Sequence, residues 1–288
     1  MKQAKIKLLS AMGIFGTVGI FVNFIPLSRP YIALCRALLG LLFLLAVMLL
    51  SQKKLDRQAI VRNLPILCLS GAAMGFNWVL LFLSYVKTGV ATATVCYYLA
   101  PLFLILLSPL VGERLTLKKC LCVAVALVGL AFVSGIMEKG IHPLSELKGV
   151  GLALGAAALY ATVMLLNKKL SPIGAYDKTV IQLASALVAI LPYLLLTEGF
   201  ALPKMSPVQW LLLAVVGFVH TGVAYALYFG AMKDLSAHTI AIFSYLDPMI
   251  AVILSALVLR QPLSGWGIAG TVLILGSALY SELPERKR

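Results

Sequence analysis

The sequence is poor in charge and poorest in acidic residues. Of its 288 residues only 10 are Asp or Glu, and charged residues of all kinds make up 12%. Hydrophobic residues make up 61%, and the mean hydropathy is +1.02. A soluble protein of this length cannot bury so much apolar surface. The composition therefore excludes a soluble globular domain and favours a protein of the lipid bilayer.

Motifs for common cofactors, metals and nucleophiles are missing as well. The chain contains no H-E-x-x-H, no G-x-S-x-G, no Walker loop and no Cys/His zinc cluster. Residues 265–270 satisfy G-x-G-x-x-G, but no βαβ unit surrounds them, so they predict no dinucleotide site. Five cysteines lack metal or disulfide spacing and are predicted to be buried packing thiols. They are Cys35, Cys68, Cys96, Cys120 and Cys122. We expect no cofactor and no metal.

Apolar stretches of membrane-spanning length are abundant. A helix needs about 20 mostly apolar residues to cross a bilayer. The runs that meet this rule are 6–26, 31–50, 64–86, 90–111, 117–137, 149–167, 177–196, 209–231, 236–259 and 264–281. The links between them are too short to hold a separate domain. The predicted fold class is all-α, a polytopic membrane protein with ten transmembrane helices.

The lysines and arginines are divided unevenly between the two ends of these runs. Arg36 lies inside the second run, six bases lie in links on one side, and the other 17 of the 24 lie on the opposite side. The six are Arg29, Lys87, Lys139, Lys148, Lys204 and Arg260. Because base-rich loops stay in the cytoplasm, both termini are predicted to be cytoplasmic, in a cell membrane. The net charge of +14 is then a topology signal, and no nucleic acid is expected as a partner.

One phrase of the fourth run returns in the ninth. Residues 97–101 read YYLAP and residues 244–248 read SYLDP, and the flanking residues align at a nearly constant offset. The pattern predicts two five-span repeats, 1–138 and 139–288. Because five is odd, the second repeat crosses the membrane in the opposite sense to the first. Inverted repeats are typical of secondary transporters, which hold substrate near the midplane where the halves meet.

The prolines of the phrase predict local breaks in helix bonding. Pro101 and Pro248 lack a backbone N–H, which frees the carbonyls of Tyr97 and Ser244 four residues earlier. In hydrocarbon, free carbonyls are tolerated only against protein or a water-filled cavity. Both prolines are therefore candidates for gating kinks, with simple packing kinks as the alternative.

Asp247 is the only acid in the interior of a predicted run, and it lies near mid-depth. An ionisable side chain there costs about 2.5–3.5 kcal/mol on insertion scales, so it suggests a function. The carboxylate could meet a substrate amine or carry a proton, and the alternative is a structural hydrogen bond to a neighbouring helix. Its counterpart in the first repeat is Ala100, so packing of the repeat does not itself require an acid.

Other polar and aromatic side chains at similar depth complete the predicted substrate site. They are Tyr97, Tyr98, Tyr245, His220, Tyr225, Asn77 and Trp78. Their rings suit an apolar or aromatic substrate by stacking, or an organic cation by cation–π contact. Core packing is the alternative for each, and for His220 it is the better one. Arg36 and its repeat counterpart Gln182 are interpreted as architectural, with the Arg36 guanidinium reaching water at the membrane surface.

The ends of the fourth and ninth runs carry a resemblance to a known family. After Pro101 the fourth run ends in GERLT, residues 112–116, and the ninth pairs Asp247 with Pro248. With its two repeats the chain resembles the drug/metabolite transporter superfamily, EamA type. The resemblance implies ten spans, cytoplasmic termini, and export of amino acids or related metabolites without a nucleotide. Gln261 stands where the family usually has Glu, so the role of the Glu113/Gln261 pair is open.

The favoured function is a secondary active exporter of amino acids or related small metabolites, driven by an ion or substrate gradient. Multidrug or organic-cation efflux is an alternative. An intramembrane enzyme is an alternative of another class, because one Asp and one His at similar depth could form a catalytic pair. The expected partners are a small-molecule substrate, the lipid bilayer and protons, with a homodimer as an open possibility.

Overall fold

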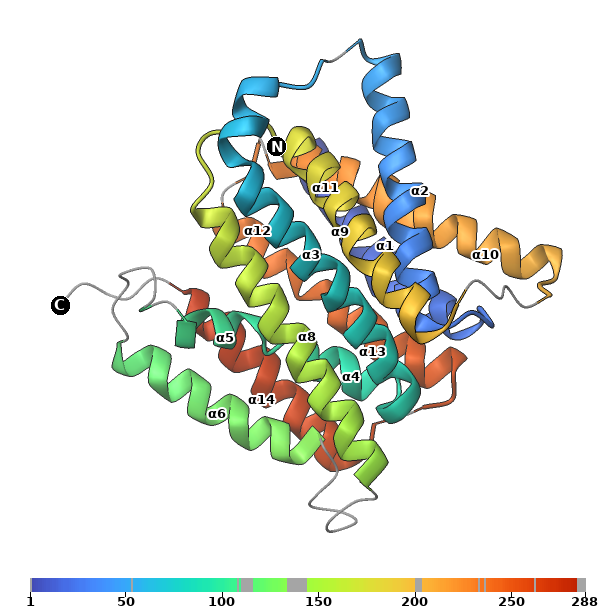
Figure 1. The fold of residues 1–288 in the computed structure, drawn as a ribbon. Coiled ribbons are helices and arrows are strands. Elements are labelled where there is room, and N and C mark those ends of the chain that lie inside the picture. The colour runs from blue at the N-terminus through green and yellow to red at the C-terminus, as the bar shows by residue number, and fades with distance from the viewer. Residues whose placement is uncertain are drawn as a thin grey trace.

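In the computed structural model, every regular element within the described residues is a helix (Figure 1). The structure describes residues 2–52, 54–107, 109, 116–133, 144–199, 204–232, 234–235, 237–261 and 263–283. In the first half the helices are α1 (Lys2–Asn23), α2 (Arg29–Leu50), α3 (Arg57–Thr88), α4 (Val90–Tyr97), α5 (Ala100–Leu107) and α6 (Leu117–Val133). In the second half they are α8 (Leu144–Lys168), α9 (Ala175–Thr197), α10 (Pro207–Gly217), η2 (Phe218–Val223), α11 (Ala224–Met232), α12 (Ala237–Ser244), α13 (Leu246–Val258) and α14 (Gly265–Glu282).

These helices coincide with the apolar runs of the sequence. Within the described residues, seven helical stretches are long and apolar enough to cross a membrane, counting α4 with α5 and α10 with η2 and α11 as single stretches. α13 and α14 are shorter apolar helices. The prediction of an all-α, multi-pass membrane fold is confirmed, while the count of ten crossings stays a prediction.

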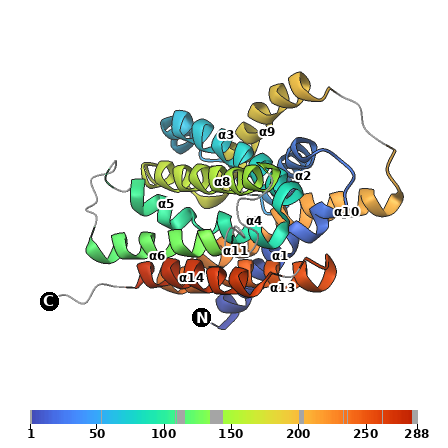
Figure 2. The ribbon, with the colours of Figure 1, turned by 90° about the horizontal axis from the view of Figure 1, so that it is seen from below.

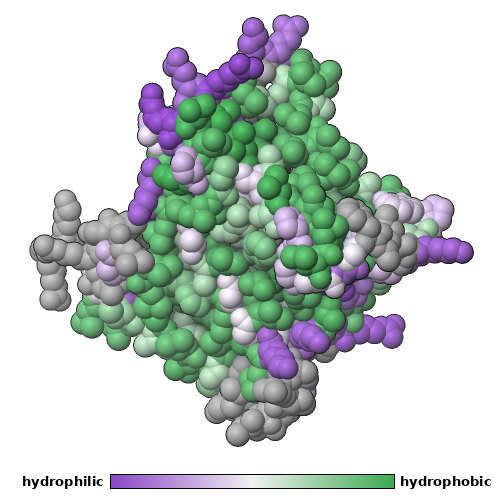
Figure 3. Space-filling view, viewed as in Figure 1, coloured by the Kyte–Doolittle hydropathy of each residue, from purple (hydrophilic) through white to green (hydrophobic). Residues whose placement is uncertain are grey.

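The molecular surface has the polarity that a bilayer requires. Apolar side chains cover most of the face in Figure 3, and the hydrophilic ones gather at its edges. Large apolar side chains such as Leu50, Leu196 and Leu257 are exposed on the outside of the helices. In water this surface would be costly, whereas against lipid chains it is not. The exposed apolar surface therefore fits a protein surrounded by lipid.

α3 is the central helix of the bundle. It packs along α8 and α9 and also touches α2 (Figures 1 and 2). On the other side α1 packs against α11 and α13, and α6 lies beside α14. The pairing of α8 with α3 thus has a counterpart in the pairing of α1 with α11. The repeat boundary near residue 138 and the inverted orientation stay predictions.

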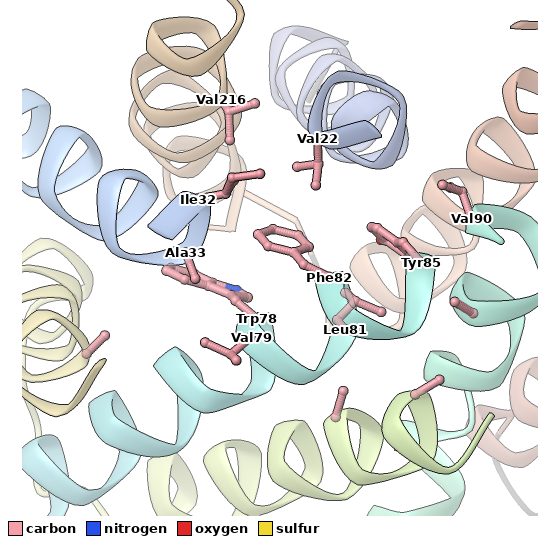
Figure 4. Close-up of a cluster of buried hydrophobic side chains, with 14 of the residues drawn as sticks. Val22, Ile32, Ala33, Trp78, Val79, Leu81, Phe82, Tyr85, Val90 and Val216 are labelled. Atoms are coloured by element: carbon pink, nitrogen blue, oxygen red, sulfur yellow. The ribbon is translucent and has the colours of Figure 1, made fainter. Parts of the chain in front are cut away.

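The core near α3 is built from large side chains that point toward α1 and α2. Figure 4 shows Trp78, Phe82 and Tyr85 along α3, facing Val22 of α1 and Ile32 of α2. Phe82 and Ile32 are fully buried. Lipid is as apolar as these side chains, so their contribution in a membrane comes mainly from close van der Waals packing. The packing fixes α3 against the first two helices.

The turn between α3 and α4 joins the two halves. Gly89 has a φ of 81°, a conformation open to glycine, and the chain reverses there. The first amide of α4, on Val90, donates to the side-chain Oε1 of Gln261 at 3.2 Å. A residue of the second half therefore caps a helix of the first. Glu113, the partner of Gln261 in the sequence alignment, lies outside the described residues.

The cysteines divide into buried and exposed positions. Cys96 and Cys122 are buried and Cys35 is partly buried, as predicted. Cys68 and Cys120 are exposed, so the prediction of buried thiols is wrong for these two. A thiol behaves as a small hydrophobic group, so an outward position on an apolar helix does not penalise it.

Candidate functional site

Both copies of the repeated phrase interrupt their helices. α4 ends at Tyr97 and α5 begins at Ala100, directly before Pro101. α12 and α13 are separated at Tyr245, three residues before Pro248. A proline ring removes one donor and clashes with the carbonyl four residues earlier, which ends regular helix bonding at these points. The two breaks occupy equivalent places in the repeats.

The two breaks meet in space. The ring centroids of Tyr98 and Tyr245 are 6.3 Å apart. The Tyr98 hydroxyl also lies 3.4 Å from the carbonyl oxygen of Ser244, the carbonyl that Pro248 frees. A side chain of the first half thus reaches an open backbone group of the second. A role of the prolines in movement stays a prediction.

Asp247 lies at this meeting point. The Tyr98 hydroxyl donates to Asp247 Oδ2 at 2.5 Å. Oδ1 accepts no hydrogen bond from any described residue, and the side chain is only partly buried. A Cβ added at Gly16 of α1 would lie 2.7 Å from the Asp247 carbonyl oxygen, so a larger residue there would push α1 away. One carboxylate oxygen of Asp247 is therefore hydrogen-bonded to Tyr98, and the other accepts no hydrogen bond from the described residues.

A second polar chain runs from Tyr97 into α3 and α8. The Tyr97 hydroxyl donates to Asn77 Oδ1 at 3.4 Å, and the Asn77 amide donates to the Ala156 carbonyl at 2.5 Å. Asn77 is 1% exposed and firmly fixed. Tyr160 of α8 adds a ring 5.6 Å from that of Tyr97 and is 40% exposed. Tyr160 was missed by the sequence predictions, which named no residue of the 149–167 run as part of the site.

The structure brings most of the predicted site residues together. The Tyr97 ring lies 6.0 Å from the Tyr98 ring and 5.6 Å from the Tyr160 ring. The Tyr225 ring lies 5.7 Å from the rings of Phe15 and Phe229. Tyr98 and Tyr245 complete this group at the helix breaks. Tyr97 comes from α4, Tyr160 from α8 and Asp247 from α13, so both halves contribute. The assignment of these side chains to substrate stays a prediction.

His220 lies apart from this group, on a π-helical turn of the eighth run. η2 is such a turn, and π-helical turns often occur at functional sites. The His220 Nδ1–H donates to the Val215 carbonyl at 3.2 Å, and Nε2 pairs with the Thr17 hydroxyl at 2.8 Å. With both ring nitrogens occupied and 1% exposure, His220 presents no open nitrogen here. Its role in binding stays a prediction.

The position of Arg36 contradicts the prediction that its guanidinium reaches water. Arg36 is 5% exposed, so its side chain is buried within the protein. Its Nε donates to Thr221 Oγ1 at 2.9 Å, and its guanidinium carbon lies 4.3 Å from the centre of the Trp78 ring. α2 can approach η2 this closely because of Gly40, where an added Cβ would lie 2.9 Å from the Thr221 Cβ. The signal was in the sequence, since Arg36 is a charge within a run, as Asp247 is.

The cation that contacts the Trp78 ring is the guanidinium of Arg36. The Trp78 ring contacts Arg36, and its predicted contact with substrate stays a prediction. The repeat counterpart of Arg36, Gln182, donates to Ser70 Oγ at 2.7 Å and to Asn167 Oδ1 at 2.8 Å. These bonds tie α9 to α3 and α8.

The site can do simple polar chemistry. A carboxylate with one open oxygen can accept a proton or hold an ammonium group, and the tyrosines around it supply hydroxyl donors and rings. Within the described ranges, no three His, Cys, Asp or Glu residues are placed to hold a metal ion. Its use as a binding site stays a prediction.

Comparison with known proteins finds membrane transporters. A model of the EamA-like transporter family matches residues 4–135 and 147–281. The chain is 31% identical over 258 residues to the Uncharacterized transporter YxxF of Bacillus subtilis, covering 87% of this chain and 80% of that protein. It is 31% identical over 180 residues to the Probable amino-acid metabolite efflux pump of Salmonella typhimurium, covering 59% of this chain and 58% of that protein.

A solved structure has the same fold. One crystal structure superposes with a TM-score of 0.66 at 19% identity, covering 98% of this chain and 96% of the other. At this identity the likeness concerns the fold alone. It supports the helical arrangement described above over nearly the whole chain.

Proposed function

The chain belongs to the EamA-like transporter family, and we propose that it is a secondary active exporter of amino acids or related small metabolites. It is a multi-pass membrane protein, and its family and relatives indicate a transporter rather than an enzyme. We propose that an ion or substrate gradient drives it, with a proton as the coupling ion.

The observation that carries this proposal is the position of Asp247. It lies where the two halves meet, at a helix break, with Tyr98 on one carboxylate oxygen and the other oxygen open. Substrate in transporters of two inverted halves binds between the halves. A carboxylate there can exchange a proton for a substrate ammonium, which links export of one to entry of the other.

Transport by purified protein in liposomes tests the proposal. We expect labelled amino acid to move without ATP when a proton or substrate gradient is imposed, and to stop when the gradient is dissipated. An absolute ATP requirement, or no movement of any amino acid under either gradient, would refute it. Organic cations serve as the competing substrates, because the aromatic rings around Asp247 also suit cations.

We propose further that the protein lies in the cell membrane with both termini in the cytoplasm. Lys54 and Lys204 are both exposed, in links assigned to opposite sides. In a cysteine-free background, Lys204→Cys should react with an impermeant thiol reagent from outside, while Lys54→Cys should be protected until the membrane is opened. The reverse labelling would contradict the charge count and the repeat orientation together.

A further inference from the structure

Arg36 is a buried charge whose hydrogen-bonding capacity is largely unused. Its guanidinium carries five N–H donors. Among the described residues it forms one hydrogen bond, from Nε–H to Thr221 Oγ1. Among the described residues, Nη1 and Nη2 form no hydrogen bond, and no carboxylate pairs with Arg36. A buried charge without a counter-charge is costly. Nη1 and Nη2, at the free edge of the guanidinium, are therefore available to bind an anion.

Two aromatic rings fix the position of the Arg36 guanidinium. The Trp78 ring lies 4.3 Å from its central carbon and the Phe82 ring 5.8 Å away. Figure 4 shows Trp78 and Phe82 on the face of α3 that is turned toward α2. A planar guanidinium fixed by a ring and one hydrogen bond leaves its two terminal nitrogens in one plane, the geometry that matches a carboxylate.

The position of Arg36 relative to Asp247 shows where that carboxylate would come from. Arg36 bonds to Thr221, and the neighbouring His220 pairs with Thr17 of α1, next to Gly16, which packs against the Asp247 carbonyl. Arg36 and Asp247 form no direct ion pair among the described residues. Trp78, which holds Arg36, follows Asn77, which accepts a hydrogen bond from the Tyr97 hydroxyl. The Tyr97 ring lies 6.0 Å from the ring of Tyr98, which donates to Asp247, so Arg36 borders the same tyrosine group as Asp247. An α-amino acid carries its ammonium and its carboxylate on one carbon and fits between two opposite charges that are near but not in contact.

We propose that Arg36 binds the carboxylate of the substrate while Asp247 binds its ammonium, so that the site selects zwitterionic α-amino acids. This inference rests on the proposed export function and specifies its substrate class. Each half of the chain contributes one of the two charges, Arg36 from α2 and Asp247 from α13. The neighbouring rings of Tyr97, Tyr98 and Tyr245 then face the substrate side chain and favour an apolar or aromatic one.

Binding of three related probes to the full-length purified protein in lipid nanodiscs tests the assignment. The probes are L-phenylalanine, phenethylamine, which lacks the carboxylate, and 3-phenylpropionate, which lacks the ammonium. L-leucine with its amine and acid analogues forms a second series. We expect wild type to bind each amino acid at least about tenfold more tightly than either analogue, because each analogue leaves one buried charge unpaired.

The variants assign each charge to one end of the ligand. Arg36→Gln should bind phenylalanine no more tightly than phenethylamine and leave phenethylamine affinity unchanged. Asp247→Asn should bind phenylalanine no more tightly than 3-phenylpropionate. Arg36→Lys keeps the charge but loses the planar fork, and should keep only part of the preference for phenylalanine over phenethylamine. Arg57→Gln makes the same change at an exposed site of α3 and should match wild type.

The outcomes separate this inference from the export proposal. If Arg36→Lys, or a folded Arg36→Gln, keeps the wild-type preference for phenylalanine over phenethylamine, Arg36 is structural and the assignment is wrong. It is also wrong if wild type binds the analogues as tightly as the amino acids, or binds none of the probes. Gradient-driven transport that persists in these cases leaves export standing. Binding with the expected pattern but no transport in liposomes removes export and keeps the site.

Discussion

In the first half of the molecule, position 36 is an arginine and position 100 an alanine, whereas the counterparts in the second half are Gln182 and Asp247. The side-chain amide nitrogen of Gln182 donates to both Ser70 and Asn167, so both of its N–H groups are used. Arg36 and Asp247 both keep unused hydrogen-bonding capacity. The architecture is thus shared between the halves, while the charges are not.

The difference shows which features the fold needs and which it does not. Helix breaks before proline occur in both halves, so they belong to the common architecture. A charge at either position occurs in one half only, so packing of a five-helix unit does not require it. Charges that are expensive in a membrane and dispensable for the fold point to function.

Removing the acid should have the largest effect. We expect Asp247→Asn to fold normally, to transport amine-bearing substrate about 100-fold more slowly, and to lose the pH dependence of transport, because truncating one partner of a buried charge pair costs about 2–5 kcal/mol. Uptake into liposomes across a series of pH values measures both. A variant with the wild-type rate and pH profile would make Asp247 a structural residue.

The hydrogen bond that holds the acid should come next. Tyr98→Phe removes a bond to a charged group, worth about 1.5–3 kcal/mol, so substrate affinity should fall about tenfold or more. Tyr97→Phe is the matched control, because the Tyr97 hydroxyl bonds at 3.4 Å to the neutral amide of Asn77. Binding assays on the two variants compare the effects. Equal losses of substrate affinity in the two variants would mean that the hydrogen bond to Asp247 contributes no more than the one to Asn77.

The proline pair tests the feature that the halves share. Pro101→Ala with Pro248→Ala restores both backbone donors and should straighten both helices. We expect normal insertion and unchanged binding, with transport slowed roughly fivefold, as for a barrier raised by about 1 kcal/mol. Initial transport rates measure this, and the two single variants show whether the halves contribute equally. A double variant with the wild-type rate would reduce the prolines to packing.

The smallest effect is expected at the cap that joins the halves. Gln261→Ala leaves the Val90 amide at the start of α4 without its acceptor and should cost about 0.5–2 kcal/mol of stability. Gln261→Glu keeps an acceptor and adds a negative charge at a helix N-terminus, which should maintain or raise stability. Thermal unfolding in detergent ranks the three proteins. An Ala variant as stable as wild type would show that water replaces the cap.

Much of the site was predictable from single residues. Asp247 stands out because it is an acid in an apolar run, and the repeated phrase located Tyr98, Tyr245 and both prolines. Arg36 was misinterpreted, because its distance from the end of the run suggested an exposed side chain. Whether a long side chain snorkels depends on what surrounds it, and Trp78 and Thr221 lie far from it in the sequence.

The sequence by itself determined the helical membrane class, the positions of the helices and the places where proline ends them, because apolar length and a missing donor act locally. Only the tertiary structure decided which polar groups meet. Tyr98 reaches Asp247 across 149 positions of the chain, and Arg36 reaches Thr221 across 185. Such contacts depend on helix crossings that close-fitting residues such as Gly16 and Gly40 allow, and crossings are a property of the packed bundle rather than of any one run.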